Sequence, residues 1–230
     1  MGQRFEYFST VNHRYSSLIF LTGAASMRGL PPDLGYEVAF AGRSNAGKSS
    51  ALNAVAARRA LARTSKTPGR TQQINFFELD ERRRLADLPG YGFAKAPADV
   101  QRRWTVLVES YLQRRECLSG LVLLMDSRRP LTELDQQMVQ WCVDAGVNLH
   151  AVLTKSDKLG RGAAMRALAE AQRTLQPLGD AVSVQLFSAT KRTGLDELRA
   201  KIDAWLRIGV ADEKLDESLG EGHESAVDES

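Results

Sequence analysis

Short apolar runs alternate with amphipathic stretches along most of this 230-residue chain. The apolar runs are bounded by glycine, proline or charged residues, which is typical of buried strands. The stretches between them carry apolar residues three and four positions apart, which is the pattern of a helix with one buried face. Strands are therefore predicted at residues 37–41, 73–79, 83–86, 120–125, 147–153 and 182–187, and helices at residues 49–58, 100–115, 133–145, 161–175 and 196–206.

Strands that alternate with helices in this way predict an α/β fold with a mostly parallel sheet and helices on both faces. The charged turn at residues 80–83 suits a hairpin between its two neighbouring strands. The apolar run Leu18–Leu21 is too short for the core of a signal peptide and predicts an edge strand or part of a helix. No run approaches the ~18 apolar residues of a membrane span, so no span is expected.

Composition and charge divide the chain into three expected segments. Residues 1–33 read as a polar lead-in that ends in Leu30-Pro31-Pro32-Asp33, residues 34–208 as the globular domain, and residues 209–230 as a disordered tail. The tail holds eight acidic residues and one lysine, which leaves residues 1–208 with 30 Lys and Arg against 20 Asp and Glu. A body with a net charge of +10 fits a polyanionic partner such as RNA, and it equally fits an ordinary solvated surface.

The cysteines and histidines give no sign of a metal cluster or a disulfide framework. Cys117 and Cys142 are far apart, and the three histidines are scattered along the chain. We therefore expect two reduced thiols in a cytoplasmic protein.

The run Gly42-Arg43-Ser44-Asn45-Ala46-Gly47-Lys48-Ser49 matches the phosphate-loop pattern G-x-x-x-x-G-K-[ST]. It lies between a predicted strand and a predicted helix, and this context argues against the alternative, a chance glycine-rich turn. The glycines let the backbone approach a phosphate chain, and the loop N–H groups and the helix N-terminus attract it. Lys48 can reach the β- and γ-phosphates, and the Ser49 hydroxyl can bind Mg²⁺.

Three further motifs follow predicted strands, at the edge where an open parallel sheet binds ligands. In Asp87-Leu88-Pro89-Gly90 the aspartate can support a Mg²⁺ shell and the glycine N–H can meet a γ-phosphate, although a plain turn is the default interpretation. In Thr154-Lys155-Ser156-Asp157 the carboxylate can accept two hydrogen bonds from guanine that adenine cannot donate. A backbone N–H of Ser188-Ala189 can meet the guanine O6 atom. Each motif is weak alone, and the series in this order is strong.

With these motifs the chain resembles the translation-factor-like GTPases and, more closely, the EngB (YihA/YsxC) family of bacterial ribosome-biogenesis GTPases in the TrmE-Era-EngA-EngB-like superfamily. The closer match lies in residues 37–53, 62–72 and 87–95. The resemblance covers roughly residues 15–207 and leaves out the acidic tail. It implies a three-layer P-loop NTPase fold with a Ras-like G domain.

The resemblance also implies a set of site residues. It gives catalytic roles to Lys48, Thr71 and Gly90, Mg²⁺ contacts to Ser49 and Thr71, and an outer place around Mg²⁺ to Asp87. Thr154 stands where Ras-like proteins have Asn, and the family shares this Thr, so guanine specificity is expected to survive. The expected contacts to GTP or GDP are Gly42, Arg43, Ser44, Asn45, Ala46, Gly47, Lys48, Ser49, Ser50, Gly69, Arg70, Thr71, Asp87, Leu88, Pro89, Gly90, Thr154, Lys155, Ser156, Asp157, Phe187, Ser188 and Ala189.

Two departures bear on hydrolysis. Tyr91 stands where Ras places its water-orienting glutamine, so we expect slow intrinsic GTP hydrolysis and a switch rather than a fast catalyst. Asn45 looks like a K⁺ ligand of related GTPases, and the alternative is that it only hydrogen-bonds within the loop. GTP is expected to order residues 59–72 and 90–97, which would present Arg63, Lys66, Arg70 and Lys95 to ribosomal RNA.

The resemblance implies a role in assembly of the large ribosomal subunit and in normal cell division and septation. A second hypothesis is a regulatory GTPase that binds a protein partner at the division site without contacting RNA. A small-molecule kinase is disfavoured, because no arginine-rich lid follows and Thr154–Asp157 would have no role. The chain shows no coiled-coil seam, so a monomer is expected.

Overall fold

The computed structural model describes residues 14–58, 61, 73–92 and 97–209. Seven strands form one sheet in the order β1-β3-β4-β2-β5-β6-β7. Their bounds are β1 (Ile19–Ala24), β2 (Tyr36–Gly42), β3 (Ile74–Asp80), β4 (Arg83–Asp87), β5 (Leu118–Asp126), β6 (Leu149–Thr154) and β7 (Val182–Leu186).

The sheet is mostly parallel, as the sequence predicts. Strand β2 pairs in parallel with β4 and β5, and the parallel pairing continues through β6 to β7. Strand β3 is antiparallel to both of its neighbours, β1 and β4. The hairpin predicted around residues 80–83 is therefore confirmed.

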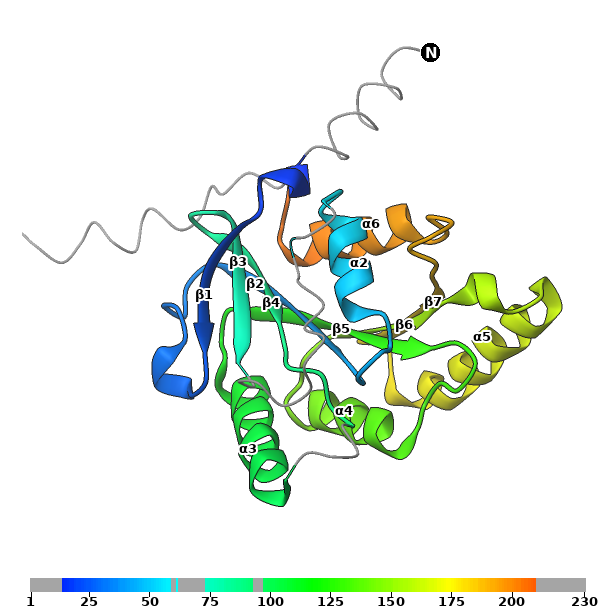
Figure 1. Cartoon of the computed structure of the whole chain (residues 1–230), viewed down its shortest axis with the longest axis horizontal. Coiled ribbons are helices and arrows are strands. Elements are labelled where there is room, and N and C mark those ends of the chain that lie inside the picture. The colour runs from blue at the N-terminus through cyan, green and yellow to red at the C-terminus, as the bar shows by residue number, and fades with distance from the viewer. Residues whose placement is uncertain (1–13, 59–60, 62–72, 93–96, 210–230) are drawn as a thin grey trace, which may run out of the picture.

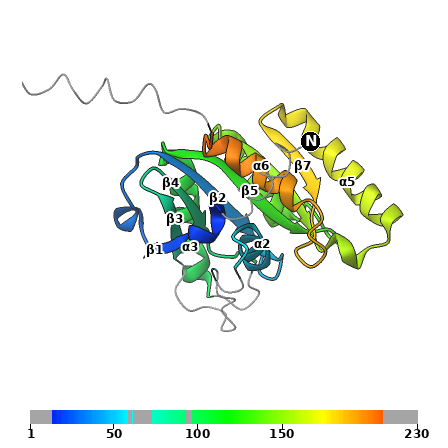
Figure 2. The same ribbon diagram turned by 90° about the horizontal axis from the view of Figure 1, so that it is seen from above.

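In the part of the chain that the structure describes, five α-helices cover the two faces of this sheet (Figures 1 and 2). They are α2 (Lys48–Val55), α3 (Ala98–Arg114), α4 (Glu133–Asp144), α5 (Arg161–Leu175) and α6 (Leu195–Trp205). Helices α2 and α6 pack on one face, where their apolar side chains meet those of β2 and β5. Helices α3, α4 and α5 pack on the other face. This three-layer arrangement confirms the predicted fold class.

One strand falls inside the segment that the sequence places before the domain. The run Leu18–Leu21, predicted as an edge strand or part of a helix, contributes to β1, which pairs with β3 from Ile19↔Glu78 to Ala24↔Ile74. Phe20 also packs edge-on against Phe77, with ring centroids 6.0 Å apart. The sheet therefore begins before residue 34. Most of the acidic tail, residues 210–230, lies outside the described residues.

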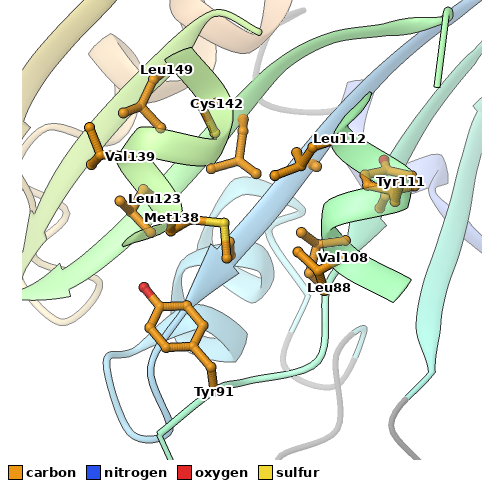
Figure 3. Close-up of a cluster of buried hydrophobic side chains, with 14 of the residues drawn as sticks. Leu88, Tyr91, Val108, Tyr111, Leu112, Leu123, Met138, Val139, Cys142 and Leu149 are labelled. Carbon is orange, nitrogen blue, oxygen red and sulfur yellow. The ribbon is translucent and has the colours of Figure 1, made fainter. Parts of the chain in front are cut away.

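The core under α3 and α4 is built mainly from aliphatic and aromatic side chains (Figure 3). It contains Trp104, whose ring centroid lies 5.5 Å from that of Tyr91 and 6.1 Å from that of Trp141. Within the described residues, no helix is long and apolar enough to cross a membrane.

A charged cluster is buried at the end of β2 that lies away from the phosphate loop. Glu37 is fully buried, and its carboxylate accepts hydrogen bonds from the Tyr111 hydroxyl at 2.6 Å and from Arg115 at 2.9 and 3.0 Å. Arg84 forms an ion pair with the same carboxylate at 2.9 Å. Arg115 also donates to the carbonyl of Pro31 at 2.8 Å, so the cluster fixes the chain where it enters β2.

A buried arginine from α6 secures the other end of the helix that follows the phosphate loop. Arg199 donates to the carbonyls of Ala54 and Val55 at 3.1 and 2.9 Å. These carbonyls belong to the last turn of α2, where a helix leaves carbonyls short of backbone donors. The contact ties α2 to α6.

His150 is the one histidine among the described residues, and it is buried between β6 and β7. Its ring nitrogens lie 2.8 Å from Ser183 Oγ and 2.7 Å from Gln185 Oε1. Burial lowers the pKa of His150 from its usual 6.5 to about 4, because the charged imidazolium would lose its hydration. Folding therefore opposes protonation of this ring.

We expect His150 to make the folded state lose stability between pH 6.5 and about 4. In that window the unfolded chain binds a proton at His150 and the folded chain does not. The free energy of unfolding therefore falls by roughly 2 kcal/mol at pH 5. Urea unfolding of the wild type and of His150→Gln at pH 7.5 and pH 5 measures the difference. The free energy of unfolding should fall more for the wild type. Equal falls for both proteins would show that the folded chain protonates His150 as readily as the unfolded chain does.

Candidate functional site

The phosphate-loop pattern forms a tight loop between β2 and α2. Gly47 has a φ of +99° and Asn45 a φ of +64°, left-handed conformations that glycine and asparagine adopt most readily. A Cβ atom on Gly42 would lie 2.7 Å from the carbonyl oxygen of Leu124. Glycine at this position therefore lets the loop pass directly over the end of β5.

The outer side of the loop is held by the predicted guanine motif. Lys155 Nζ donates to the Asn45 carbonyl at 2.6 Å, and Thr154 Oγ1 lies 2.5 Å from the Ala46 carbonyl and 3.0 Å from that of Met125. The carbonyls of Asn45 and Ala46 thus accept hydrogen bonds from the guanine motif. The end of β6 thus positions the loop as well as the following Asp157.

The motif Asp87-Leu88-Pro89-Gly90 follows β4 and lies beside the loop. Asp87 is largely buried and forms an ion pair with Lys48. Leu88 N–H donates to the Phe40 carbonyl at 2.9 Å, and the Pro89 carbonyl accepts from the Trp104 indole N–H at 3.1 Å. The segment is therefore tied both to β2 and to α3.

Gly90 packs closely on the phosphate loop. A Cβ atom on Gly90 would lie 3.7 Å from both the Gly42 carbonyl and the Ser44 nitrogen. The next residue, Tyr91, accepts a hydrogen bond from Ser44 N–H at 2.8 Å through its carbonyl. Its ring is buried in the core beside Met138 (Figure 3). Sequence reasoning treated Tyr91 only as a missing glutamine and did not find this packing.

The predicted guanine end is organised around Asp157. Ser188 Oγ donates to Asp157 Oδ1 at 2.6 Å, and this hydrogen bond lowers the pKa of Asp157. The Ser188 N–H donates to the Thr193 carbonyl at 3.0 Å, so it is already used within the protein. Two backbone N–H groups, those of Ser188 and Ala189, are predicted to meet guanine O6. Because the first is already bonded, the N–H of Ala189 is the better candidate for this contact.

Asp126, at the end of β5, is a residue that sequence reasoning missed. It accepts hydrogen bonds from Lys155 Nζ at 3.0 Å and from Arg128 at 2.6 and 2.9 Å. These bonds, those of Arg128 first, hold the pKa of Asp126 well below its usual range. Its place after the run 120–125, at the same sheet edge as the other motifs, was the available signal.

A cleft of about 510 Å³ opens beside the phosphate loop, and cationic side chains dominate its lining. The lining residues are Arg43, Ser44, Asn45, Ala46, Asp126, Arg128, Arg129 and Lys155. Arginine and lysine in this number favour an anionic partner at this edge.

Several predicted residues cannot be placed. Gly69, Arg70 and Thr71, expected at the nucleotide, and Arg63, Lys66 and Lys95, expected at RNA, lie outside the described residues. Within the described residues there is no group of three or more His, Cys, Asp or Glu side chains that could hold a metal ion.

The described residues thus bring together a phosphate cradle, a lysine paired with an aspartate and an oriented carboxylate. Such an arrangement can bind a nucleotide phosphate chain and recognise a base that offers two adjacent N–H donors.

Comparison with known proteins agrees with this geometry. Residues 37–155 match the family model described as "50S ribosome-binding GTPase". The chain is 54% identical over 193 residues to a probable GTP-binding protein EngB of Coxiella burnetii, which covers 84% of this chain and 94% of the relative. A protein with the same description from Vibrio parahaemolyticus is 48% identical, over 88% of this chain and 92% of the relative.

Solved structures support the fold. A crystal structure of a probable GTP-binding protein engB superposes with a TM-score of 0.61 at 22% identity, over 74% of this chain and 98% of that one. A point variant of Aquifex aeolicus Era bound to GDP·AlF4⁻ superposes with a TM-score of 0.57 at 20% identity, over 74% of this chain and 56% of that one. The sequence relatives decide the family: the chain belongs to the 50S ribosome-binding GTPases and, among them, to the EngB GTP-binding proteins.

Proposed function

We propose that this protein binds GTP and GDP with Mg²⁺, hydrolyses GTP slowly, and acts as a nucleotide switch in assembly of the large ribosomal subunit. The same activity would make it necessary for normal cell division and septation. The observation that carries the proposal is the direct contact between the phosphate loop and the guanine motif, through Thr154 and Lys155.

In the proposed bound state Lys48 and Asp87 exchange partners. The two side chains now neutralise each other at the floor of the site. Lys48 would form an ion pair with a β- or γ-phosphate. The Asp87 carboxylate, released from Lys48, would accept hydrogen bonds from water molecules around Mg²⁺. The Ser49 hydroxyl, partly exposed in the first turn of α2, and Thr71 would hold the ion directly. An oxygen-only site completed by phosphates is what Mg²⁺ prefers, and the ion would neutralise charge that develops on the phosphates.

Base recognition rests on Asp157. Ser188 holds one carboxylate oxygen in place, so the carboxylate is oriented before the base arrives. It can accept from the N1–H and the 2-amino group of guanine, and adenine offers neither donor in that arrangement.

Slow hydrolysis is supported by the position of Tyr91. Its side chain is buried in the core and hydrogen-bonded to Asp135 at 2.8 Å, so it is not directed at the phosphate loop. Nothing on this side chain can orient an attacking water.

Contact with ribosomal RNA is supported by the basic cleft beside the loop and by membership of the 50S ribosome-binding GTPase family. Arg128 and Arg129 are exposed at its rim, beside residues of the phosphate loop. The alternative is a protein partner at the division site, with no RNA contact. The two proposals differ in the ligand that the GTP form should bind.

Removal of the Thr154 hydroxyl should weaken nucleotide binding. Thr154→Val keeps the shape of the side chain and loses the one hydroxyl proton that can be donated to the carbonyl of Ala46 or Met125. We expect the affinity for GDP to fall about fivefold to tenfold, since one such bond contributes about 1 kcal/mol. Isothermal titration calorimetry measures the change, and Thr154→Ser, which keeps the hydroxyl, is the matched control. Equal affinities for the two variants would contradict the role given to Thr154.

Potassium should accelerate hydrolysis if Asn45 is a K⁺ ligand. Asn45 is exposed at the turn of the loop, so its amide oxygen can reach an ion beside the phosphates. We expect the rate in KCl to exceed that in NaCl of equal ionic strength by about tenfold or more, because a fixed positive charge stabilises the developing phosphate charge. Phosphate release measures the rate. Equal rates in the two salts would leave Asn45 with its alternative role inside the loop.

The proposed function is tested by co-sedimentation with separated ribosomal subunits, in GDP or a non-hydrolysable GTP analogue, over a salt series. We expect binding to the large subunit in the GTP form only, with an affinity that falls steeply as salt rises, as phosphate contacts require. Nuclease treatment of the subunits is the control for RNA contact. Failure to bind in either nucleotide state would reject the ribosome proposal and favour the protein partner.

A further inference from the structure

A fully buried carboxylate at the start of α4 contacts both the phosphate loop and the segment after β4. Asp135 has no exposed surface, and its Oδ2 atom accepts from the N–H and the hydroxyl of Thr132 at 3.0 and 2.7 Å. The bond from the Thr132 N–H is one half of a capping box at the N-terminus of α4, and in the other half the Asp135 N–H donates to the Thr132 side chain. The two bonds to Oδ2 leave Oδ1 and one further side of Oδ2 for partners outside the helix.

The first outside partner is Tyr91, which follows Gly90 directly. Its hydroxyl donates to Asp135 Oδ1 at 2.8 Å, and the ring is 4% exposed. Burial, and then the neighbouring carboxylate, raise the pKa of Tyr91 well above its usual value, so the hydroxyl keeps its proton and donates it.

The second outside partner is Arg43, the second residue of the phosphate loop. Its Nε atom lies 3.3 Å from Asp135 Oδ2 in an ion pair, and its Nη2 atom donates to the Arg129 carbonyl at 3.2 Å. Arg43 therefore joins the loop to the start of α4 and to the rim of the basic cleft.

These contacts form a closed circuit through Tyr91, the residue that follows Gly90. The backbone of Tyr91 is bound to Ser44 N–H at 2.8 Å, and its side chain is bound through Asp135 to Arg43 of the same loop. Gly90 precedes Tyr91 directly in the chain and packs against Gly42 and Ser44 of the same loop. The residue that follows Gly90 is thus held through its backbone and through its side chain, which restricts the backbone of Gly90 as well.

We propose that Asp135 and Tyr91 are positioning residues that hold the N–H of Gly90 where a third phosphate would meet it, and so set the preference for GTP over GDP. The inference rests on the proposed nucleotide function. If Gly90 is held in place before the nucleotide binds, the affinity rises only for a ligand that accepts a hydrogen bond from its N–H. GTP can accept this bond through its γ-phosphate, and GDP has no γ-phosphate.

The chain offers a matched control for the Tyr91 hydroxyl. Tyr111 is also fully buried in the core under α3, and its hydroxyl also donates to a buried carboxylate, that of Glu37, at 2.6 Å. Figure 3 shows Tyr91 and Tyr111 in the same cluster, with Tyr111 on α3 and away from the phosphate loop. Loss of either hydroxyl removes one bond to a carboxylate, and only one of them lies beside Gly90.

The test is the affinity of Tyr91→Phe and Tyr111→Phe for a fluorescent non-hydrolysable GTP analogue and for the matching GDP analogue. We expect Tyr91→Phe to bind the GTP analogue about fivefold more weakly and the GDP analogue within twofold of wild type. Tyr111→Phe should lower the melting temperature and leave the ratio of the two affinities unchanged. Asp135→Asn, which keeps the size of the side chain, should change the ratio in the same direction as Tyr91→Phe.

The inference is overturned if Tyr91→Phe and Asp135→Asn weaken both analogues equally or leave both affinities unchanged. A purely structural role would give that result together with a lower melting temperature. Failure of the wild type to bind either guanine analogue would instead reject the proposed nucleotide function itself, and calorimetry with GTP and GDP on the wild type distinguishes the two outcomes.

Discussion

The burial of Glu37 at the start of β2 is the constraint on which the position of the phosphate loop depends. A carboxylate without exposed surface is tolerated only when donors surround it, and here Tyr111, Arg84 and Arg115 come from α3, β4 and the end of α3. Removal of one partner of such a group typically costs about 3–5 kcal/mol. The cluster therefore fixes the start of β2 against its neighbours. The phosphate loop follows the other end of the same strand, so its position is fixed as well. Arg199 completes this frame by holding the far end of α2.

The two halves of the proposed nucleotide site are mechanically joined. Lys155 and Thr154 bind the carbonyls of Asn45 and Ala46, so the guanine motif holds the backbone of the phosphate loop directly. The same short segment then turns to present Asp157, which Ser188 orients from the next strand. A base bound to Asp157 would therefore contact the same short segment whose Thr154 and Lys155 hold the phosphate loop. This is a physical reason for the guanine motif to begin with a side chain that can donate, because threonine at position 154 reaches the loop directly.

Much of the fold and the core of the site follow from the sequence, because both are encoded over short distances. The strands and helices predicted from the apolar pattern are all present, and the phosphate-loop pattern correctly predicts the turn between β2 and α2. What escaped depends on contacts between residues far apart in the chain. The place of β1 in the sheet is set by its pairing with β3, and its exposed Ile19 and Phe20 give no burial pattern. The bond from Ser188 N–H to Thr193 and the partners of Asp126 could not be predicted, since each needs the folded geometry.

Tyr91 shows how one position can link two properties that would otherwise need separate explanations. A glutamine there would have to remain near the phosphates to orient water, and it would then be unable to anchor the segment in the core. A tyrosine at this position is long enough to reach Asp135, and its ring has apolar partners in Trp104 and Met138. The proposed slow hydrolysis and the proposed positioning of Gly90 are therefore two consequences of the same side chain. A group that is committed to holding the segment after β4 cannot also act on the bond that is cleaved.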